Sequence, residues 1–159
     1  MPFARISLNS LIKKPYDFEP KTLGEHIRKK RLKMGLMQKE IANQLGVVPW
    51  TILNWEKGHT EPPIVSIPAI VQFLGYDPFP EPMTLPQRLL AKRREMGWSI
   101  KEVAKAVGVD PCTWGNWERG KLILYHQHRA MVARVLGLSV SSMNKEMATR
   151  WNRLHECVR

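Results

Sequence analysis

The sequence predicts an all-α protein made of two tandem helical bundles followed by a C-terminal amphipathic helix. Three observations lead to this prediction. Residues 22–58 align without a gap with residues 84–120, at a shift of 62 positions and with seventeen identities. Both copies carry helix-start and helix-stop signals at matching places. From about residue 141, apolar residues recur every three or four positions, as they do on one face of a helix.

The first helix of each copy is predicted from its two ends. TLGE at 22–25 and TLPQ at 84–87 are capping boxes, in which a threonine side chain and an acid or amide satisfy each other's backbone groups. Apolar residues then recur at helical spacing. Gly35 and Gly97 follow, and glycine is the residue that most often ends a helix.

Two shorter helices are expected next in each copy. One extends from about Gln38 to Leu45, and its counterpart begins with a capping box at Ser99. Pro49 and Pro111 then stand where proline suits a helix best, in its first turn. Two short helices joined by a tight glycine-containing turn form a helix-turn-helix motif, so each repeat is predicted to contain one.

Five parts are expected along the chain, because a proline-rich stretch separates the two repeats. They are an N-terminal arm at 1–21, a first helix-turn-helix domain at 22–76, a linker at 77–83, a second helix-turn-helix domain at 84–138 and the amphipathic helix at 139–159. Each repeat is near the lower size limit for a core of its own. Two cysteines without a CxxC pair argue against a zinc site and favour a reducing compartment, so a cytoplasmic protein is expected.

The third helix of each copy is expected to have one outward and one inward face. Steps of about 100° per residue separate its side chains into these two groups. The outward group is Trp50, Leu53, Asn54 and Lys57, or Cys112, Gly115, Asn116 and Arg119 in the second copy; the inward group is Ile52, Trp55 and Glu56, or Trp114, Trp117 and Glu118.

The inward-facing glutamates need partners, because a buried carboxylate is costly unless it is paired. An arginine lies at the edge of the apolar stripe on the first helix of both copies. We therefore predict two structural ion pairs, Arg31–Glu56 and Arg93–Glu118, that tie the first helix to the end of the third.

Each copy resembles the helix-turn-helix domain of the Cro, phage-repressor and Xre family. The segments that carry the resemblance are TLGEHIRKKR, MQKEIANQLGV and TILNWEKG, and TLPQRLLAKRR, SIKEVAKAVGV and TWGNWERG. The likeness covers about residues 22–76 and 84–138. It implies compact, repressor-like bundles of about five helices, with the third helix in the major groove of DNA.

The resemblance also implies which residues contact DNA. Base-edge contacts are expected from Pro49, Trp50 and Asn54, and a phosphate contact from Gln38. The full set of candidate DNA-contact residues is Gln38, Pro49, Trp50, Thr51, Asn54, Lys57, His59, Thr113, Asn116, Arg119 and Lys121. Trp50 is suited either to a thymine methyl group or to a protein partner.

The second copy departs from this pattern of contact residues. Asp110 and Cys112 stand where the first copy has Val48 and Trp50, and Ile100 replaces the glutamine. We therefore expect the first copy to be the better reader of sequence.

The charge of the chain favours double-stranded DNA as the partner. The net charge is +11, with +4 on residues 21–76 and +6 on residues 84–140. The longest apolar run, at 64–75, is too short to span a bilayer, so no membrane association is expected. Motifs of catalysis, cofactor binding or metal binding are missing, so an enzyme is not expected. The leading hypothesis is a DNA-binding transcriptional regulator.

The alternative hypothesis is a protein-interaction subunit, antitoxin-like or part of a nucleoprotein machine, that uses the same fold. It rests on Trp50 and on the C-terminal helix, whose apolar stripe has coiled-coil-like spacing. That stripe would fold back on the second domain, form a homodimer seam or dock another protein. Its residues are Met143, Met147, Trp151, Leu154 and Val158.

Overall fold

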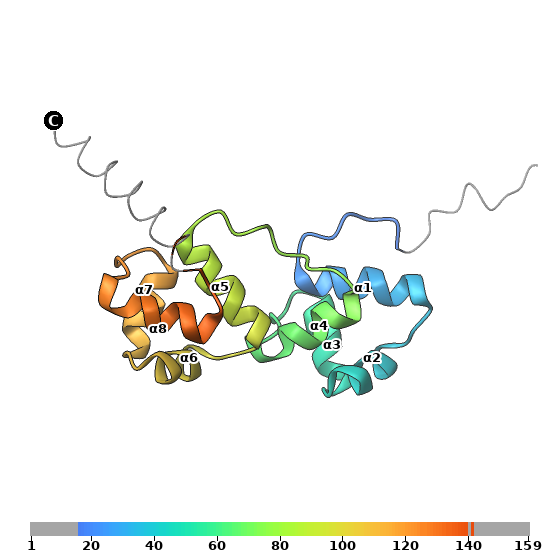
Figure 1. Cartoon of the computed structure of the whole chain (residues 1–159). Coiled ribbons are helices and arrows are strands. Elements are labelled where there is room, and N and C mark those ends of the chain that lie inside the picture. Colours follow the sequence, from blue (N-terminus) through green and yellow to red (C-terminus); the bar gives the residue numbers. More distant parts are fainter. Residues whose placement is uncertain (1–15, 140, 142–159) are drawn as a thin grey trace, which may run out of the picture. The chain divides into compact units, whose positions relative to one another are not determined.

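In the computed structural model, which describes residues 16–139 and 141, all regular elements are helices (Figure 1). The all-α prediction is therefore confirmed for this part of the chain. The C-terminal helix with its candidate partner-binding residues, and most of the N-terminal arm, lie outside the described residues. The helices are α1 (Leu23–Met34), α2 (Gln38–Leu45), α3 (Pro49–Glu56), α4 (Ile67–Leu74), α5 (Leu85–Met96), α6 (Ile100–Val107), α7 (Pro111–Glu118) and α8 (His126–Leu136).

The chain forms two compact units. The first extends to Pro63 and takes in Ala69–Pro78, and the second comprises Ile64–Pro68 and the described chain from Phe79 onward. Helices α1, α2 and α3 belong to the first unit, and α5 to α8 to the second. The division passes through the start of α4, which a short 3-10 helix at Ile64–Ser66 precedes.

The helix ends form where the local sequence signals predict them. Thr22 Oγ1 accepts a hydrogen bond from the Glu25 backbone N–H at 3.2 Å, and Glu25 Oε2 accepts one from the Thr22 N–H at 3.3 Å. The equivalent box at the start of α5 is also closed. At the other ends of these helices, Gly35 and Gly97 have φ angles of 68° and 66°. This left-handed conformation strains residues with a side chain, so glycine suits both positions.

Each unit has its own hydrophobic core. In the first, Ile27 of α1, Ile41 of α2 and Ile52 of α3 are fully buried. In the second, the core is formed by buried residues of all four helices and the loop before α8. They are Leu85, Leu89, Val103, Ala104, Val107, Trp114, Trp117, Leu124, Val132, Ala133 and Leu136.

The first domain differs from the expected five-helix bundle. Residues 22–76, all of which are described, contain four α-helices and the 3-10 helix. After α4 the chain reaches Gly75, in a left-handed conformation with φ 77°, and then a stretch with prolines at 78, 80 and 82. Proline lacks the backbone N–H that a helix interior requires, so no helix continues through residues 78–82.

Helices α1 and α3 approach so closely that only glycine fits at one position. A Cβ atom on Gly24 would overlap the backbone carbonyl oxygen of Trp55. This contact fixes how α3 is seated against α1. The second unit has Pro86 at the equivalent place.

Candidate nucleic-acid interface

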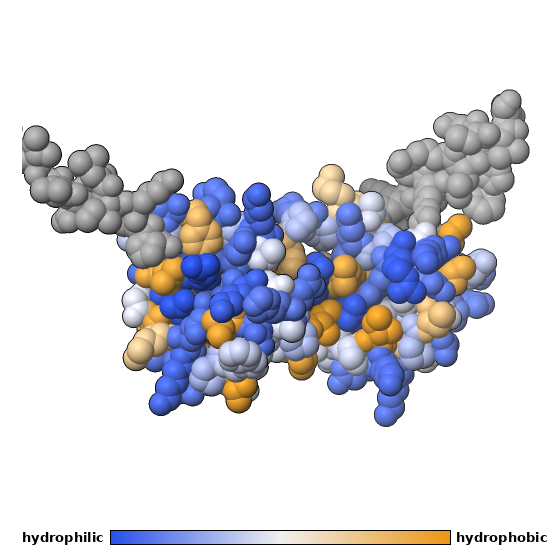
Figure 2. Space-filling model, turned by 180° about the vertical axis from the view of Figure 1, so that it is seen from behind, coloured by the Kyte–Doolittle hydropathy of each residue, from blue (hydrophilic) through white to orange (hydrophobic). Residues whose placement is uncertain are grey.

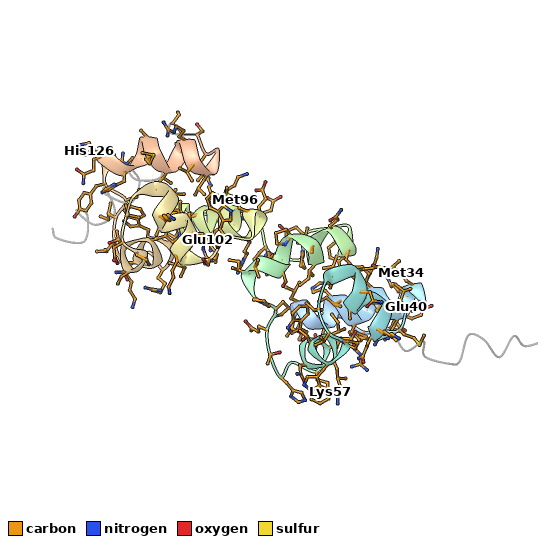
Figure 3. All side chains as sticks on the ribbon, turned by 90° about the horizontal axis from the view of Figure 1, so that it is seen from below. Met34, Glu40, Lys57, Met96, Glu102 and His126 are labelled. Atoms are coloured by element: carbon orange, nitrogen blue, oxygen red, sulfur yellow. The ribbon has the colours of Figure 1, made fainter. Side chains whose placement is uncertain are left out.

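Helix α3 presents its polar and apolar side chains as the 100° pattern predicts. Ile52, Trp55 and Glu56 are buried, with exposed fractions of 0%, 3% and 6%. Trp50, by contrast, is 67% exposed. Lys57, at the end of the helix, is exposed and lies at the outer edge of the first unit in Figure 3. Leu53 and Asn54 of the same outward face are half-buried.

Other candidate contact residues of the first unit lie at the start of α3, within it and in the loop after it. Pro49 begins it and is exposed, whereas Thr51 is half-buried. Beyond the left-handed Gly58, the backbone N–H of His59 donates to the Asn54 carbonyl at 2.9 Å. The loop is thus held against the end of α3, with the His59 side chain exposed.

Both predicted ion pairs are formed. In the first unit, Arg31 donates from Nε to Glu56 Oε1 at 2.7 Å and from Nη2 to Glu56 Oε2 at 2.8 Å. Its third nitrogen, Nη1, donates to the Leu36 carbonyl at 3.1 Å. The two side chains are only 13% and 4% exposed. The pair therefore joins α1, the turn after it and the end of α3.

Gln38 belongs to this ion-pair network. Its Nε2 donates to Glu56 Oε2 at 2.9 Å, so one amide N–H is directed inward. The resemblance implied a phosphate contact at this residue. An amide has two N–H donors, so such a contact would have to use the second.

In the second unit Glu118 also accepts three hydrogen bonds, but the third donor comes from a different position. Arg93 donates from Nε and Nη2 at 2.6 and 2.8 Å, and its Nη1 bonds the Trp98 carbonyl at 3.0 Å. Ile100, which is equivalent to Gln38, has no hydrogen-bond donor in its side chain. The third bond to Glu118 comes instead from Trp114 Nε1, at 2.6 Å.

This exchange was not predicted from the sequence. Trp114 stands at the place that Ile52 holds in the first unit. One signal in the sequence could have indicated it. Trp114 was expected to face inward, and a buried indole N–H usually donates to an acceptor.

The outward face of α7 forms a local network of hydrogen bonds. Arg119 Nη2 donates to Asn116 Oδ1 at 3.0 Å, and the Asn116 amide contacts Cys112 Sγ at 3.7 Å. Gly115 was predicted to face outward but is buried, because the Arg119 guanidinium covers it. In the first unit, the Asn54 side chain has no hydrogen-bond partner among residues 16–139. The groups that could bind bases are therefore freer on α3 than on α7.

The remaining candidates of the second unit are Thr113 and Lys121. Thr113 is half-buried within α7, whereas Lys121 is exposed. The backbone N–H of Lys121 donates to the Asn116 carbonyl at 2.9 Å, as the His59 N–H does to Asn54 in the first unit. The loops after α3 and α7 thus have the same backbone arrangement.

The N-termini of the two helices also differ. Asp110 caps α7, accepting a hydrogen bond from the Cys112 N–H at 2.7 Å. Val48 precedes α3 and provides no side-chain cap. Unpaired N–H groups and the helix dipole make an open N-terminus favourable for anions. A carboxylate at the N-terminus, such as that of Asp110 on α7, makes anion binding there less favourable.

Hydrophilic side chains cover most of the face shown in Figure 2, with apolar side chains scattered between them. Within the described part of the chain, no helix has the length and apolarity needed to cross a membrane.

Comparison with known proteins places a family match on the first unit. A model of a helix-turn-helix family matches residues 27–79, which are 53 of the 159 residues. The matched segment includes all of α2 and α3 and ends before α5. A search of curated proteins and a search of solved structures each found no match.

Proposed function

We propose that this chain is a DNA-binding protein, a transcriptional regulator, that reads duplex DNA chiefly with α3. The outward face of α3 carries the proposal. It combines an exposed aromatic, an asparagine amide that has no hydrogen-bond partner among the described residues and an exposed lysine, within a segment that matches a helix-turn-helix family. In helix-turn-helix proteins the second helix of the motif enters the major groove.

The second unit is proposed to be another copy of the same fold. Three observations support this proposal: the seventeen identities between residues 22–58 and 84–120, the matching order of helices, and an arginine–glutamate pair with the same bonding atoms in both units. The family match ends at residue 79 and includes none of the helices α5 to α8, so the repeat within the chain is what carries the assignment.

The two units are proposed to contribute differently to DNA binding. On α7, Asn116 accepts a hydrogen bond from Arg119, and the carboxylate of Asp110 caps the start of the helix. Cys112 stands at the place of the tryptophan. The second repeat nevertheless has the larger positive charge, +6 on residues 84–140 against +4 on residues 21–76. We expect it to bind phosphates without regard to sequence, while the first unit sets specificity.

A pair of matched variants tests this division of roles. Duplexes would first be selected from a random pool with the full chain. Asn54→Ala should then narrow the difference in binding free energy between selected and random duplex by roughly 1–3 kcal/mol, because a bidentate adenine contact is lost. Asn116→Ala, at the equivalent position of α7, should leave that difference nearly unchanged. Fluorescence anisotropy at one fixed salt concentration measures both.

Two results would contradict the proposal. If no duplex is enriched and none binds at low salt, the protein does not recognise DNA. If Asn116→Ala reduces specificity more than Asn54→Ala does, the roles of the two units are reversed. The alternative function, a protein-interaction subunit, depended largely on the C-terminal stripe, which lies outside the described residues.

A further inference from the structure

We infer that the start of α3 recognises the C5 methyl groups of pyrimidines in the major groove. The residues concerned are Val48, Pro49 and Trp50, which we call the apolar tip of α3. The inference rests on the proposed function and specifies what the first unit reads. The chemistry is that of thymine, and 5-methylcytosine offers the same methyl group at the same ring position.

The apolar tip consists of three consecutive exposed residues. Val48 is 62% exposed and Trp50 is 67% exposed, and the proline between them is also exposed. None of the three contributes to the buried core of the first unit. Grouped apolar side chains in contact with water often mark a binding surface. The tip is therefore available to an apolar group on a ligand.

The rest of the outward face indicates that this ligand is DNA. Asn54 follows Trp50 by one helical turn, and Lys57 follows on the same side. The carboxylate of α3, Glu56, is buried and paired with Arg31, so the outward face presents no negative charge. An apolar ring, an amide and a cation, those of Trp50, Asn54 and Lys57, thus follow one another along one face of α3. The major groove offers methyl groups, base edges and phosphates as their complements.

The C5 methyl is the apolar group that bases present in the major groove. Thymine shows it there beside its O4 acceptor, and its adenine partner shows N6 and N7. Asn54 is suited to those adenine atoms. It lies about 6 Å from Trp50 along the helix axis, which is roughly two base-pair steps. The tip and Asn54 therefore both favour A·T pairs, at neighbouring positions of one site.

The second unit lacks this tip and serves as an internal comparison. Asp110 and Cys112 replace Val48 and Trp50, so the start of α7 has a carboxylate where α3 has an apolar side chain. A methyl-dependent signal from the full chain should therefore come from α3.

Methyl deletion within an otherwise unchanged duplex tests the inference. The full chain would be titrated with a duplex selected from a random pool, with the same duplex carrying deoxyuridine for thymidine, and with the deoxyuridine duplex carrying 5-methylcytosine for cytosine. Loss of the methyl groups should weaken binding about fourfold for each methyl buried against the tip. A gain on adding 5-methylcytosine shows that either methyl source serves, and no gain identifies thymine as the source.

Two variants establish which residues read the methyl groups. The double variant Val48→Ala/Trp50→Ala should bind the thymidine and deoxyuridine duplexes nearly equally, with a nearly unchanged melting temperature because both side chains are exposed. Tyr125→Ala, which removes an exposed aromatic (62%) from the second unit, should keep the full methyl effect.

Equal binding of the two duplexes by the unaltered chain would overturn the inference and leave the proposed function standing. A methyl effect that persists at full size in the Val48→Ala/Trp50→Ala double variant would also overturn it, since a group outside the tip would then be the reader. Failure to bind any duplex at low salt would overturn both.

Discussion

At the scale of single residues, the two units solve one physical problem with different side chains. Glu56 and Glu118 each accept three hydrogen bonds, two from an arginine and one from a further donor. The further donor is Gln38 in one unit and Trp114 in the other. A buried carboxylate without donors would be costly, so loss of the glutamine is tolerated where the tryptophan supplies an N–H.

Removing either partner of the first ion pair should destabilise the protein. Arg31→Ala and Glu56→Ala should each cost roughly 3–5 kcal/mol, because each leaves an uncompensated buried charge. The double variant should lose much less than the sum, since the charges are then both gone. Chemical denaturation of the four proteins measures this coupling. Additive losses would mean that the two charges do not interact.

The exchange of donors in the second unit can be reversed by mutation. Trp114→Phe keeps an aromatic ring but removes the indole N–H, and should destabilise by about 1–3 kcal/mol. Ile100→Gln in that background supplies an amide from the place that Gln38 holds in the first unit. It should recover part of the loss, whereas Ile100→Gln alone should not stabilise. Equal effects of Ile100→Gln in both backgrounds, measured by thermal melts, would argue against the exchange.

At the scale of helices, the local signals in the sequence were sufficient to predict most of the boundaries. Capping boxes, left-handed glycines and first-turn prolines act within a few residues, so they can be read without knowledge of tertiary structure. The helix at Gln38–Leu45 and the two faces of α3 are examples. Packing between helices was harder to predict from the sequence, because it depends on partners that are distant along the chain.

Three differences show what local signals miss. The donor exchange couples positions on two helices of one unit, so neither position reveals it alone. Gly115 is buried because a flexible arginine folds over it, which helix periodicity does not describe. The resemblance implied a bundle of about five helices, but after Gly75 the chain of the first domain enters a proline-rich stretch instead of another helix.

The close contact between α1 and α3 leads to a prediction about glycine. Alanine normally favours a helix over glycine by about 1 kcal/mol. Gly24→Ala should nevertheless lower the melting temperature, because its Cβ would overlap the Trp55 carbonyl. Gly115→Ala is the matched control, since its Cβ would meet only the end of the Arg119 side chain, which can move. That variant should be neutral or stabilising. A Gly24→Ala protein as stable as the original would contradict the close approach.

At the scale of the whole molecule, charge and repetition together support recognition of DNA. The net charge of +11 is carried mainly by the two repeats. The glutamates of α3 and α7 are paired inside their units, which keeps negative charge off the proposed contact faces. General attraction to phosphates is thus expected of both repeats, whereas base reading is proposed for one.

The measurement that tests DNA recognition most directly is the salt dependence of affinity for duplex DNA. Titrations of the full chain at several salt concentrations should give a straight line in a plot of log affinity against log salt. The expected slope is about −0.9 for each phosphate contact, because each contact releases condensed counterions. Arg119→Ala should make the slope less steep by about one unit for selected and random duplex alike. An affinity that does not change with salt, or no binding at the lowest salt, would contradict the account.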